Sequence, residues 1–302
     1  MPEELSAAPA FDPVFDHELV RRALAEDIGR GDMTTEATIP QGTCATARIV
    51  TREAGVVAGL PIVELAFRLL DPNLRFDSAV REGAHVEAGA TLASLSGDAR
   101  ALLSAERTAL NFLGRLSGIA TLAARCAAAV AGTRATVVDT RKTTPGLRAL
   151  EKYAVRIGGA GNHRSGLDDG ILIKDNHIAA VGGVRQAIAS ARAHAPHLLR
   201  VEVECDDETQ VCDAVEAGAE AILLDNMPLD RLRQNVEWIR THAPRTLIEA
   251  SGGIGSDPEQ LAAVAATGVD LISLGALTHS APNFDVSLEF KTRRASTAEG
   301  RA

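Results

Sequence analysis

Aromatic residues and long apolar runs are scarce in this chain of 302 residues. Aromatic side chains make up 3% of it, so Ala, Val, Leu and Ile must build any core. No uncharged apolar run approaches the roughly 20 residues that a membrane-spanning helix needs. The N-terminal segment MPEELSAAPAFDPVF contains neither the basic region nor the apolar region of a signal peptide. We therefore expect a cytoplasmic protein that does not enter membranes.

Cysteines are few and show no metal-binding spacing. The chain contains no CxxC pair, and four cysteines do not make a disulfide framework in a protein of this length. We expect free thiols at Cys44, Cys126, Cys205 and Cys212.

Lysine is absent before Lys142. Residues 76–99 have the Gly-x-x-Val-x-x-Gly rhythm of tight turns between short strands, similar to biotinyl and lipoyl domains. Those domains attach their cofactor to a lysine, so the absence of lysine excludes a swinging-arm carrier. We interpret this region as a β-rich scaffold.

Basic residues are concentrated in residues 139–177, although the formal net charge of the chain is -9. Such a segment in an acidic protein suggests a pocket for a small polyanion, because a nucleic-acid-binding protein is usually basic over a whole face. The alternative is a solvated helix face with ordinary surface charges. The segment contains Arg141, Lys142, Arg148, Lys152, Arg156, His163, Arg164, Lys174 and His177.

After Gly118, apolar runs alternate with amphipathic segments, a pattern that predicts βαβ units and a parallel sheet. No G-x-G-x-x-G follows the first run, which favours a barrel over a dinucleotide-binding sheet. Six strands are fewer than the usual eight, so we predict an α/β fold with an open or incomplete (β/α) TIM-like barrel. The predicted strands are ATVVDT, GILIK, RVEVEC, AEAILLDN, TLIEASGG and VDLISLGAL.

Two domains are expected. Residues 1–118 form an N-terminal α/β sandwich domain, residues 119–280 form the barrel, and residues 281–302 pack back on the first domain. A helix is predicted from about residue 101 to Gly118, followed by a separate Ala-rich helix. We expect residues 1–12 and the polar C-terminal end to be loosely attached.

Polar residues stand at the end of every predicted barrel strand. One such residue is uninformative, because turns favour Asp, Ser and Gly, but six ends in register indicate an active site at the carboxyl edge of the sheet. In chain order these residues are Arg141 and Lys142, Lys174, Glu204, Asp225, Ser251 with Gly252 and Gly253, and Ser273 with Gly275.

The two glycine-containing ends, EASGG and ISLGA, would present backbone N–H groups just before helices, as in barrel phosphate sites. Glu204 and Asp225 are isolated acids among the cations. They suit a Mg²⁺ ion or the hydroxyl groups of a sugar, or they balance the charge of nearby Arg and Lys.

The longest motif is EKYAVRIGGAGNHRSGLDDGILIKDNH, preceded by DTRKTTPGLR and followed by VEVEC, LLDN, EASGGI and SLGALTHSAP. Together with EDIGRGDMTT and SAERTALNFLGRLSGIAT, it resembles the quinolinate phosphoribosyltransferase family, also called nicotinate-nucleotide pyrophosphorylase (carboxylating). The resemblance covers nearly the whole chain. One departure is Ala160 in GGAGNHR, where many members of the family carry glycine.

The resemblance implies an enzyme of de novo NAD biosynthesis. It would transfer a phosphoribosyl group from phosphoribosyl pyrophosphate to quinolinate, with Mg²⁺ required, and form nicotinate mononucleotide, pyrophosphate and CO₂. It also implies at least a homodimer, or a trimer of dimers (a hexamer), in which Arg107 completes the site of the neighbouring subunit.

The resemblance assigns roles to individual residues. Lys142, Lys174, Glu204 and Asp225 would be catalytic, and the two acids would hold Mg²⁺ directly or through water or substrate. The implied substrate-binding residues are Arg107, Thr140, Arg141, Lys142, His163, Arg164, Lys174, Glu204, Asp225, Ser251, Gly252, Gly253, Ser273, Leu274 and Gly275.

Three other readings remain open. A Schiff-base aldolase would use Lys174 as the amine that attacks a carbonyl. A phosphoribosyltransferase of the same fold would act on nicotinate or another base. A barrel that binds nucleotides without catalysis would release no pyrophosphate. His177 could orient the end of the strand that carries Lys174 or cap a helix, and we favour the capping role. No metal-ligand spacing is found for His17, His85, His194, His197 and His242.

Overall fold

The computed structural model describes residues 13–292, and the expectation for residues 1–12 lies outside this range. The polar C-terminal end was expected to be loosely attached from Glu289 onward, but residues 289–292 belong to a paired strand, and the rest of that end lies outside the described range. The chain divides into two compact units, one formed by Met1–Thr121 with Pro282–Ala302 and the other by Leu122–Ala281. Within the described range, no helix is both long enough and apolar enough to cross a bilayer. All four cysteines are free thiols, as predicted.

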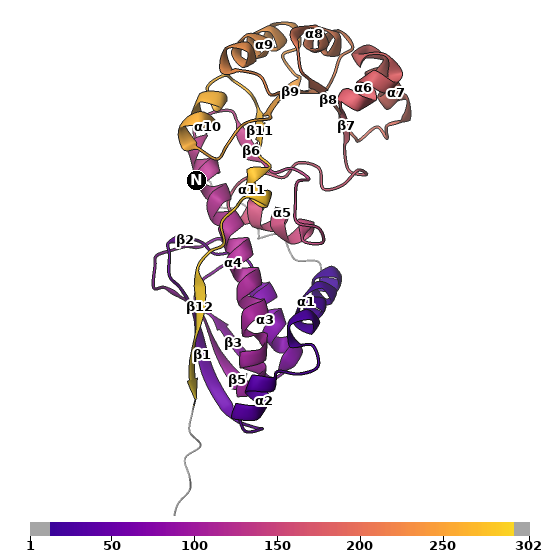
Figure 1. The fold of residues 1–302 in the computed structure, drawn as a ribbon. Coiled ribbons are helices and arrows are strands. Elements are labelled where there is room, and N and C mark those ends of the chain that lie inside the picture. Colours follow the sequence, from indigo (N-terminus) through magenta and orange to yellow (C-terminus); the bar gives the residue numbers. More distant parts are fainter. Residues whose placement is uncertain (1–12, 293–302) are drawn as a thin grey trace, which may run out of the picture. The chain divides into compact units, whose positions relative to one another are not determined.

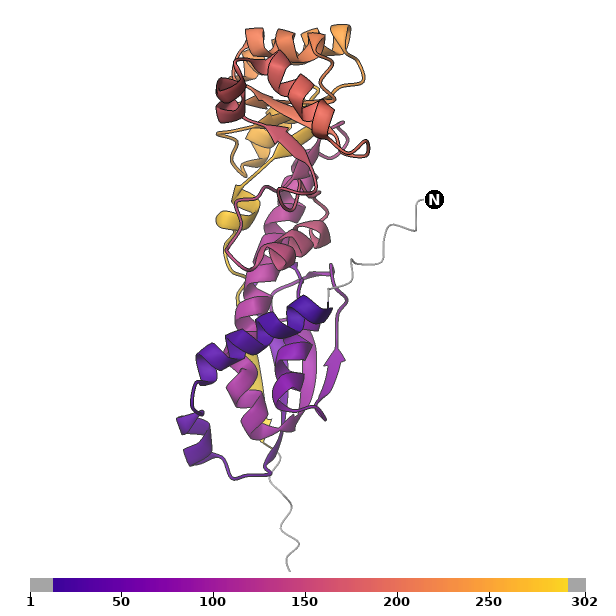
Figure 2. The ribbon, with the colours of Figure 1, turned by 90° about the vertical axis from the view of Figure 1, so that its right-hand side faces the viewer.

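The first unit contains a four-stranded antiparallel sheet with strand order β12-β1-β5-β3, and a short pair of β2 with β4. Alternate residues of β1 are buried, as the sequence pattern predicts. Figure 1 shows α3 and α4 against this sheet, and α1 contacts α3 (Figure 2). The strands are β1 (Cys44–Thr51), β2 (Gly55–Val56), β3 (Arg75–Ser78), β4 (His85–Val86), β5 (Thr91–Asp98) and β12 (Val286–Thr292). The helices are α1 (Pro13–Ile28), α2 (Met33–Thr38), α3 (Leu60–Leu70) and the first part of α4 (Ala99–Ala129).

The prediction of two helices separated at Gly118 is wrong, because α4 continues through this position as one helix of 31 residues. A glycine inside a helix costs only about 1 kcal/mol relative to alanine, so it does not end a helix with apolar sequence on both sides. A Cβ atom at Gly118 would lie 1.9 Å from the carbonyl oxygen of Pro282. The glycine therefore lets the returning chain approach the helix.

The second unit contains a six-stranded parallel sheet with strand order β6-β11-β10-β9-β8-β7, which confirms the six predicted strands and the α/β fold. Figure 1 shows helices α6 to α10 along the outside of this curved sheet. The strands are β6 (Thr136–Val138), β7 (Ile171–Ile173), β8 (Val201–Cys205), β9 (Ala221–Asp225), β10 (Leu247–Ser251) and β11 (Leu271–Ser273). The helices are α5 (Arg148–Ile157), α6 (Asp175–Val181), α7 (Val184–His194), α8 (Glu208–Glu216), α9 (Leu229–His242), α10 (Pro258–Ala265) and α11 (Ala276–His279).

The barrel is open between the segment that follows α5 and strand β7. Gly161 forms a single parallel bridge to Val138 of β6, so this segment contributes one residue in place of a full strand. Among the described residues, only β8 pairs with β7. The prediction of an open TIM-like barrel is confirmed, and the carboxyl ends of all six strands lie at one edge of the sheet.

Candidate active site

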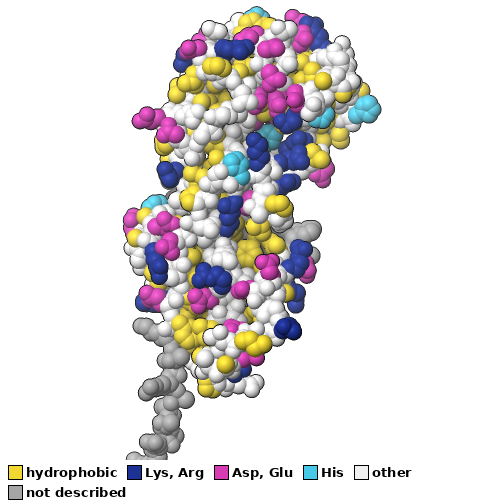
Figure 3. Space-filling model, viewed as in Figure 1, with side chains coloured by type: hydrophobic (Ala, Val, Ile, Leu, Met, Phe, Trp, Pro, Cys, Tyr) yellow, Lys and Arg dark blue, Asp and Glu magenta, His cyan; other side chains and the backbone are white. Residues whose placement is uncertain are grey.

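A cavity of about 440 Å³ lies at the carboxyl edge of the parallel sheet. Because parallel strands end at the same edge, residues from distant parts of the sequence meet here. In Figure 3, basic side chains gather beside acidic ones on the viewed face of this unit. The lining residues are Thr140, Arg141, Lys142, His163, Arg164, Leu172, Lys174, Glu204, Leu223, Asp225, Asn226, Glu249, Ser251, Gly252, Gly253 and Ser273.

Two guanidinium groups lie on the side of the cavity formed by β6 and the bridge segment. The buried Nε atom of Arg141 has no hydrogen-bond partner within the described structure, whereas Nη1 of Arg164 donates to the Gly170 carbonyl at 3.0 Å. Burial lowers the pKa of Arg164, and the positive charge of Arg141 lowers it further. Two like charges held together, one with an unused buried donor, make this side of the cavity suited to an anion.

The basic residues of segment 139–177 fall into two groups in the structure, those that line the cavity and those that bind other protein groups. Arg141, Lys142 and Arg164 reach the cavity, but the three cations of α5 are absent from its lining and bind protein groups instead. Lys152 pairs with Asp139, Arg148 donates to Thr143, and Arg156 donates to Asn162. The expectation that the whole segment lines one anion pocket is therefore too broad.

His163 lines the cavity and contacts two acids. Its Nε2 atom is 3.2 Å from a carboxylate oxygen of Glu202 and 3.4 Å from one of Glu249. Glu249 is 1% exposed, and neither of its oxygens accepts a well-formed hydrogen bond from a described residue. The Nδ1 atom of His163 accepts the backbone N–H of Arg164 at 2.8 Å.

This cluster retains a proton above neutral pH. The close contacts with the carboxylates of Glu202 and Glu249 raise the pKa of His163 to about 10, and burial raises the pKa of Glu202. Because Nδ1 already accepts the Arg164 N–H, the ring carries its proton on Nε2.

The opposite side of the cavity carries an ion pair and further acids. Lys174, which follows β7, pairs with Glu204 of β8. Carboxylate oxygens of Glu204, Asp206 and Asp225 lie within 4.8 Å of one another. Burial raises the pKa of Asp206, and the negative charge of Asp225 adds to the shift. One ammonium group therefore faces three acids, an arrangement that suits a cation or the hydroxyl groups of a sugar.

The backbone of Lys174 is fixed by the start of α6. His177 accepts the Lys174 backbone N–H through Nδ1 at 3.0 Å, and its own N–H donates to the Lys174 carbonyl at 2.8 Å. The capping role predicted for His177 is confirmed.

Residues with left-handed backbone conformations follow both β9 and β10, and the backbone N–H of Asn226 donates to the Ser251 carbonyl at 2.9 Å. Gly252 and Gly253 have φ angles of +82° and +63°, and Asn226 has a φ of +52°. A Cβ atom at Gly252 would lie 2.4 Å from Oδ1 of Asn226 and 2.7 Å from Oδ1 of Asp225. Only glycine fits at position 252, and Gly252 and Gly253 line the cavity together with Asp225.

Two family models match this chain. The C-terminal domain of quinolinate phosphoribosyl transferase matches residues 119–289, and the N-terminal domain matches residues 32–117. The chain belongs to the quinolinate phosphoribosyl transferase family.

Relatives of the family match over almost their full length. The chain is 46% identical to the nicotinate-nucleotide pyrophosphorylase [carboxylating] of Mycobacterium leprae (strain TN), over 92% of this chain and 98% of the relative. It is 43% identical to a probable enzyme of the same name from Bacillus subtilis (strain 168), over 93% and 96%. The solved structure of nicotinate-nucleotide pyrophosphorylase from Francisella tularensis has a TM-score of 0.88 at 35% identity, covering 95% of this chain and all of that one.

Most of the site predicted for a quinolinate phosphoribosyl transferase is gathered in one cavity. The exceptions are Arg107, Leu274 and Gly275, which are absent from its lining. Leu274 is fully buried, and its backbone N–H donates to Val138 at 2.9 Å. A Cβ atom at Gly275 would lie 3.0 Å from Cδ of Lys142, so this glycine makes room for the lysine. Arg107 is exposed on α4 in the other unit.

Several lining residues were not predicted from the sequence. Leu172, Leu223, Asn226 and Glu249 line the cavity. Glu202 was also missed, although strand alternation provides a signal for it, because residues two apart share a face with Glu204. The same signal applies to Glu249, which stands two residues before Ser251 in β10 and shares its face. Only its contact with His163, which is distant in the sequence, could not be read from this pattern.

Proposed function

We propose that this cavity performs the reaction of the quinolinate phosphoribosyl transferase family with the residue roles described below. A phosphoribosyl group passes from phosphoribosyl pyrophosphate to quinolinate, and the products are nicotinate mononucleotide, pyrophosphate and CO₂. The observation that supports this most strongly is the division of the cavity into a cationic side and a side with acids, one lysine and a glycine turn. Such a cavity matches a dicarboxylate next to a phosphorylated sugar.

Quinolinate is proposed to bind on the cationic side. Its two adjacent carboxylates need several fixed donors, and guanidinium groups are favoured because they can bind a carboxylate through two hydrogen bonds. Arg141 has an unused buried donor, and Arg164 lies close enough for the two charges to influence one another. His163 is proposed to orient the ligand as part of the wall, since both of its ring nitrogens have partners within the protein.

Phosphoribosyl pyrophosphate is proposed to bind on the opposite side. The amides of Gly252 and Gly253 would hold its phosphate, with Ser251 and Ser273 as further hydroxyl donors in the same cavity. Glu204 and Asp225 would accept the ribose hydroxyl groups. Lys174 and Lys142 would neutralise the pyrophosphate.

Mg²⁺ is part of this proposal, and the acids fit it. Glu204, Asp225 and Asp206 offer carboxylate oxygens within 4.8 Å of one another, and Mg²⁺ prefers a few carboxylates together with water and phosphate oxygens. When bound, the ion would offset the negative charge of the pyrophosphate. Glu204 and Asp225 would hold it directly or through water or substrate.

The chemistry requires no covalent nucleophile from the protein. The pyridine nitrogen attacks the ribose carbon that bears pyrophosphate, so positive charge grows on the ribose while negative charge grows on the leaving group. The acids stabilise the first charge and Lys174 the second, and catalysis is mainly positioning and electrostatics. Loss of CO₂ follows because the quaternised ring nitrogen stabilises the carbanion that is left.

Assembly and location complete the proposal. We place Arg107 in the active site of a neighbouring subunit, in a homodimer or a trimer of dimers, on the basis of the family resemblance. A cytoplasmic location is supported by the four free thiols, which are typical of reducing compartments.

The remaining alternatives fit this cavity less well. A Schiff-base aldolase needs a neutral amine, whereas Lys174 forms an ion pair with Glu204. A nicotinate-specific enzyme has no need for so many donors on the cationic side. A nucleotide-binding barrel without catalysis leaves the acids opposite Lys174 without a role.

A single comparison tests the proposed reaction. The protein is supplied with phosphoribosyl pyrophosphate, Mg²⁺ and either quinolinate or nicotinate, and the mononucleotide, pyrophosphate and CO₂ are measured together. We expect equal amounts of all three products from quinolinate and little product from nicotinate. Preferential turnover of nicotinate, or binding without pyrophosphate release, contradicts the proposal.

A further inference from the structure

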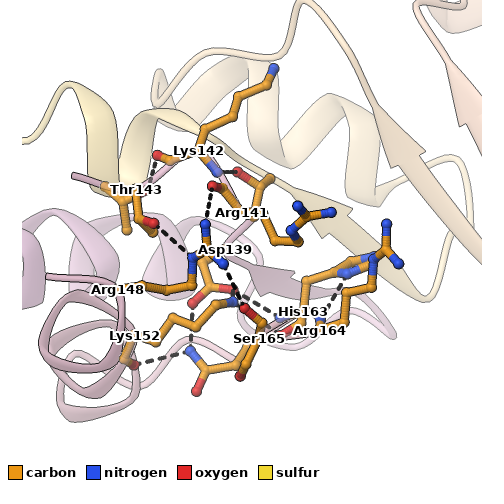
Figure 4. A network of polar contacts seen from close by, with 12 residues as sticks. Asp139, Arg141, Lys142, Thr143, Arg148, Lys152, His163, Arg164 and Ser165 are labelled. Atoms are coloured by element: carbon orange, nitrogen blue, oxygen red, sulfur yellow. Dashed lines mark hydrogen bonds and ion pairs between the residues drawn. The ribbon is translucent and has the colours of Figure 1, made fainter. Parts of the chain in front are cut away.

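Asp139, which directly follows β6, is a fully buried carboxylate with three partners from a distant segment (Figure 4). It pairs with the ammonium group of Lys152 on α5. It also accepts the side-chain amide of Asn162 at 2.5 Å and the backbone N–H of His163 at 2.9 Å. The residue that precedes Thr140 and Arg141 is thereby tied to the peptide that carries His163.

Lys152 strengthens the same connection from the other side. It is 3% exposed, and its Nζ atom donates to the His163 carbonyl at 3.0 Å as well as to Asp139. The backbone ladder between these segments is short, because Gly161 forms only a single bridge to Val138. The ion pair continues the connection beyond the point where regular strand pairing ends.

Arg148, one turn before Lys152 on α5, makes a second connection. Its Nε atom donates to the Thr143 hydroxyl at 3.0 Å, and its Nη1 atom donates to the Ser165 carbonyl at 3.0 Å. Thr143 belongs to the loop of Arg141 and Lys142, whereas Ser165 directly follows Arg164. Figure 4 shows these connections lying between the two segments that carry the cavity cations.

The stability of the protein does not account for a buried ion pair at this place. Burial raises the pKa of Asp139 even though Lys152 is beside it, so desolvation offsets much of the attraction. Replacing buried ion pairs by well-packed apolar residues is often neutral or stabilising. What the pair supplies is a fixed distance between two loops.

We propose that Lys152 and Asp139, supported by Arg148, are positioning residues that set the spacing between Arg141 and Arg164 so that the two guanidinium groups match two adjacent carboxylates. The inference rests on the proposed function, because it assigns the cationic side of the cavity to quinolinate. Of the residues proposed to bind phosphoribosyl pyrophosphate, only Lys142 lies in a loop that these contacts hold. The ion pair therefore controls affinity for the dicarboxylate much more strongly than affinity for the sugar phosphate.

The test compares equilibrium binding of the two substrates to Lys152→Met. Methionine keeps most of the length of the side chain and removes the charge and the donors. The dissociation constant of quinolinate, measured by calorimetry, is expected to rise by on the order of 10-fold to 100-fold, since a displacement of about 1 Å has effects of that size. The KM of phosphoribosyl pyrophosphate is expected to stay within about twofold.

Arg148→Met is the second variant, because the half-buried Arg148 can be removed without leaving a buried charge. It is expected to weaken quinolinate binding in the same direction by a smaller factor, also with an unchanged KM for phosphoribosyl pyrophosphate. This variant decides the question if Lys152→Met fails to fold.

Arg240→Met is the matched control. Arg240 pairs with Asp270 at 2.6 Å and donates to the carbonyls of Thr246 and Gly268, at the opposite end of the sheet. We expect a lower melting temperature and unchanged binding of both substrates.

The outcomes separate the inference from the function on which it rests. If the unmodified protein neither binds quinolinate nor turns it over, the proposed function fails. If the unmodified protein is active, and the folded variants of Lys152 and Arg148 bind quinolinate normally or lose both substrates equally, the positioning role is wrong.

Discussion

The ammonium group of Lys174 and the carboxylate of Glu204 form an ion pair across the carboxyl ends of β7 and β8. The side chain of Glu204 is 12% exposed, whereas that of Lys174 is 44% exposed. In the proposed reaction each group must also serve a substrate, Lys174 the pyrophosphate and Glu204 the ribose or the metal ion. We therefore expect this ion pair in the protein without substrates, and we expect each of the two groups to contact a substrate once the substrates bind.

Glu204→Gln should separate catalysis from dicarboxylate binding. The amide cannot stabilise positive charge on the ribose, so kcat should fall by on the order of 100-fold, the size expected for one electrostatic group. The dissociation constant of quinolinate should not increase, because Glu204 is proposed to lie on the opposite side of the cavity, which receives phosphoribosyl pyrophosphate. Steady-state kinetics and calorimetry check this, with Glu208→Gln as control, since Glu208 pairs with Arg231 on the surface. An equal loss in kcat and in quinolinate affinity contradicts the assigned role.

Gly252→Ala should impair the sugar-phosphate side of the cavity. The new Cβ atom would meet Asn226 and Asp225 at 2.4 and 2.7 Å, and the φ of +82° is unfavourable for alanine. The KM of phosphoribosyl pyrophosphate should rise by on the order of tenfold or more, because its phosphate is proposed to bind the amides of this turn. Gly132→Ala isolates the backbone effect, since Gly132 has a φ of +80° and no atom within 4 Å of a new Cβ. Equal kinetics in the two variants would show that the turn has no part in binding.

The cluster of His163, Glu202 and Glu249 predicts a loss of stability in alkaline solution. Since the pKa of His163 is raised from 6.5 to about 10, its contribution to the free energy of unfolding is complete below pH 6.5 and is lost as the pH rises through about 10. Glu249→Gln replaces one carboxylate by a neutral amide. The melting temperature of the variant should therefore decrease less between pH 7 and pH 10 than that of the unmodified protein. Identical slopes would mean that the cluster holds no additional proton.

The assignment of Arg107 to a neighbouring subunit predicts complementation between two inactive variants. Arg107→Ala and Lys174→Ala should each be inactive when produced alone. After co-expression, each mixed dimer would contain one intact site, so activity should recover to about a quarter of the unmodified level for random pairing. If Arg107 acts within its own subunit, no mixed dimer contains an intact site and no activity returns.

The positions of the strand ends were predictable from the sequence. The apolar runs mark the strands, and parallel strands all end at the same edge of the sheet. Lys174, Glu204 and Asp225 each follow or end an apolar run, and the structure places them together in one cavity. Gly118 was misinterpreted because a glycine that ends a helix and a glycine that admits a neighbouring chain look the same in a sequence. The difference lies in the approach of Pro282, a contact between distant residues.

The number of basic residues in a segment predicted the cavity residues less reliably than their position at the end of a strand. Arg148 and Lys152 belong to the basic segment, but α5 directs them to the loops beneath the cavity. The contact of Glu249 with His163 has no sequence signal, because it depends on how β10 and the bridge segment meet in space. Sequence reasoning therefore found the groups that line the cavity better than those that support them.

The most direct test of the account is release of CO₂ from quinolinate by Arg141→Ala in a single turnover, compared with Arg185→Ala. Arg185 forms surface ion pairs with Asp213 and Glu216, so its variant should behave like the unmodified protein. Arg141 is proposed to bind quinolinate, so CO₂ release by Arg141→Ala should fall by on the order of 100-fold or more while the melting temperature stays close to that of the control. Release within about threefold of the control by a folded Arg141→Ala variant would contradict the assignment of this cavity to quinolinate.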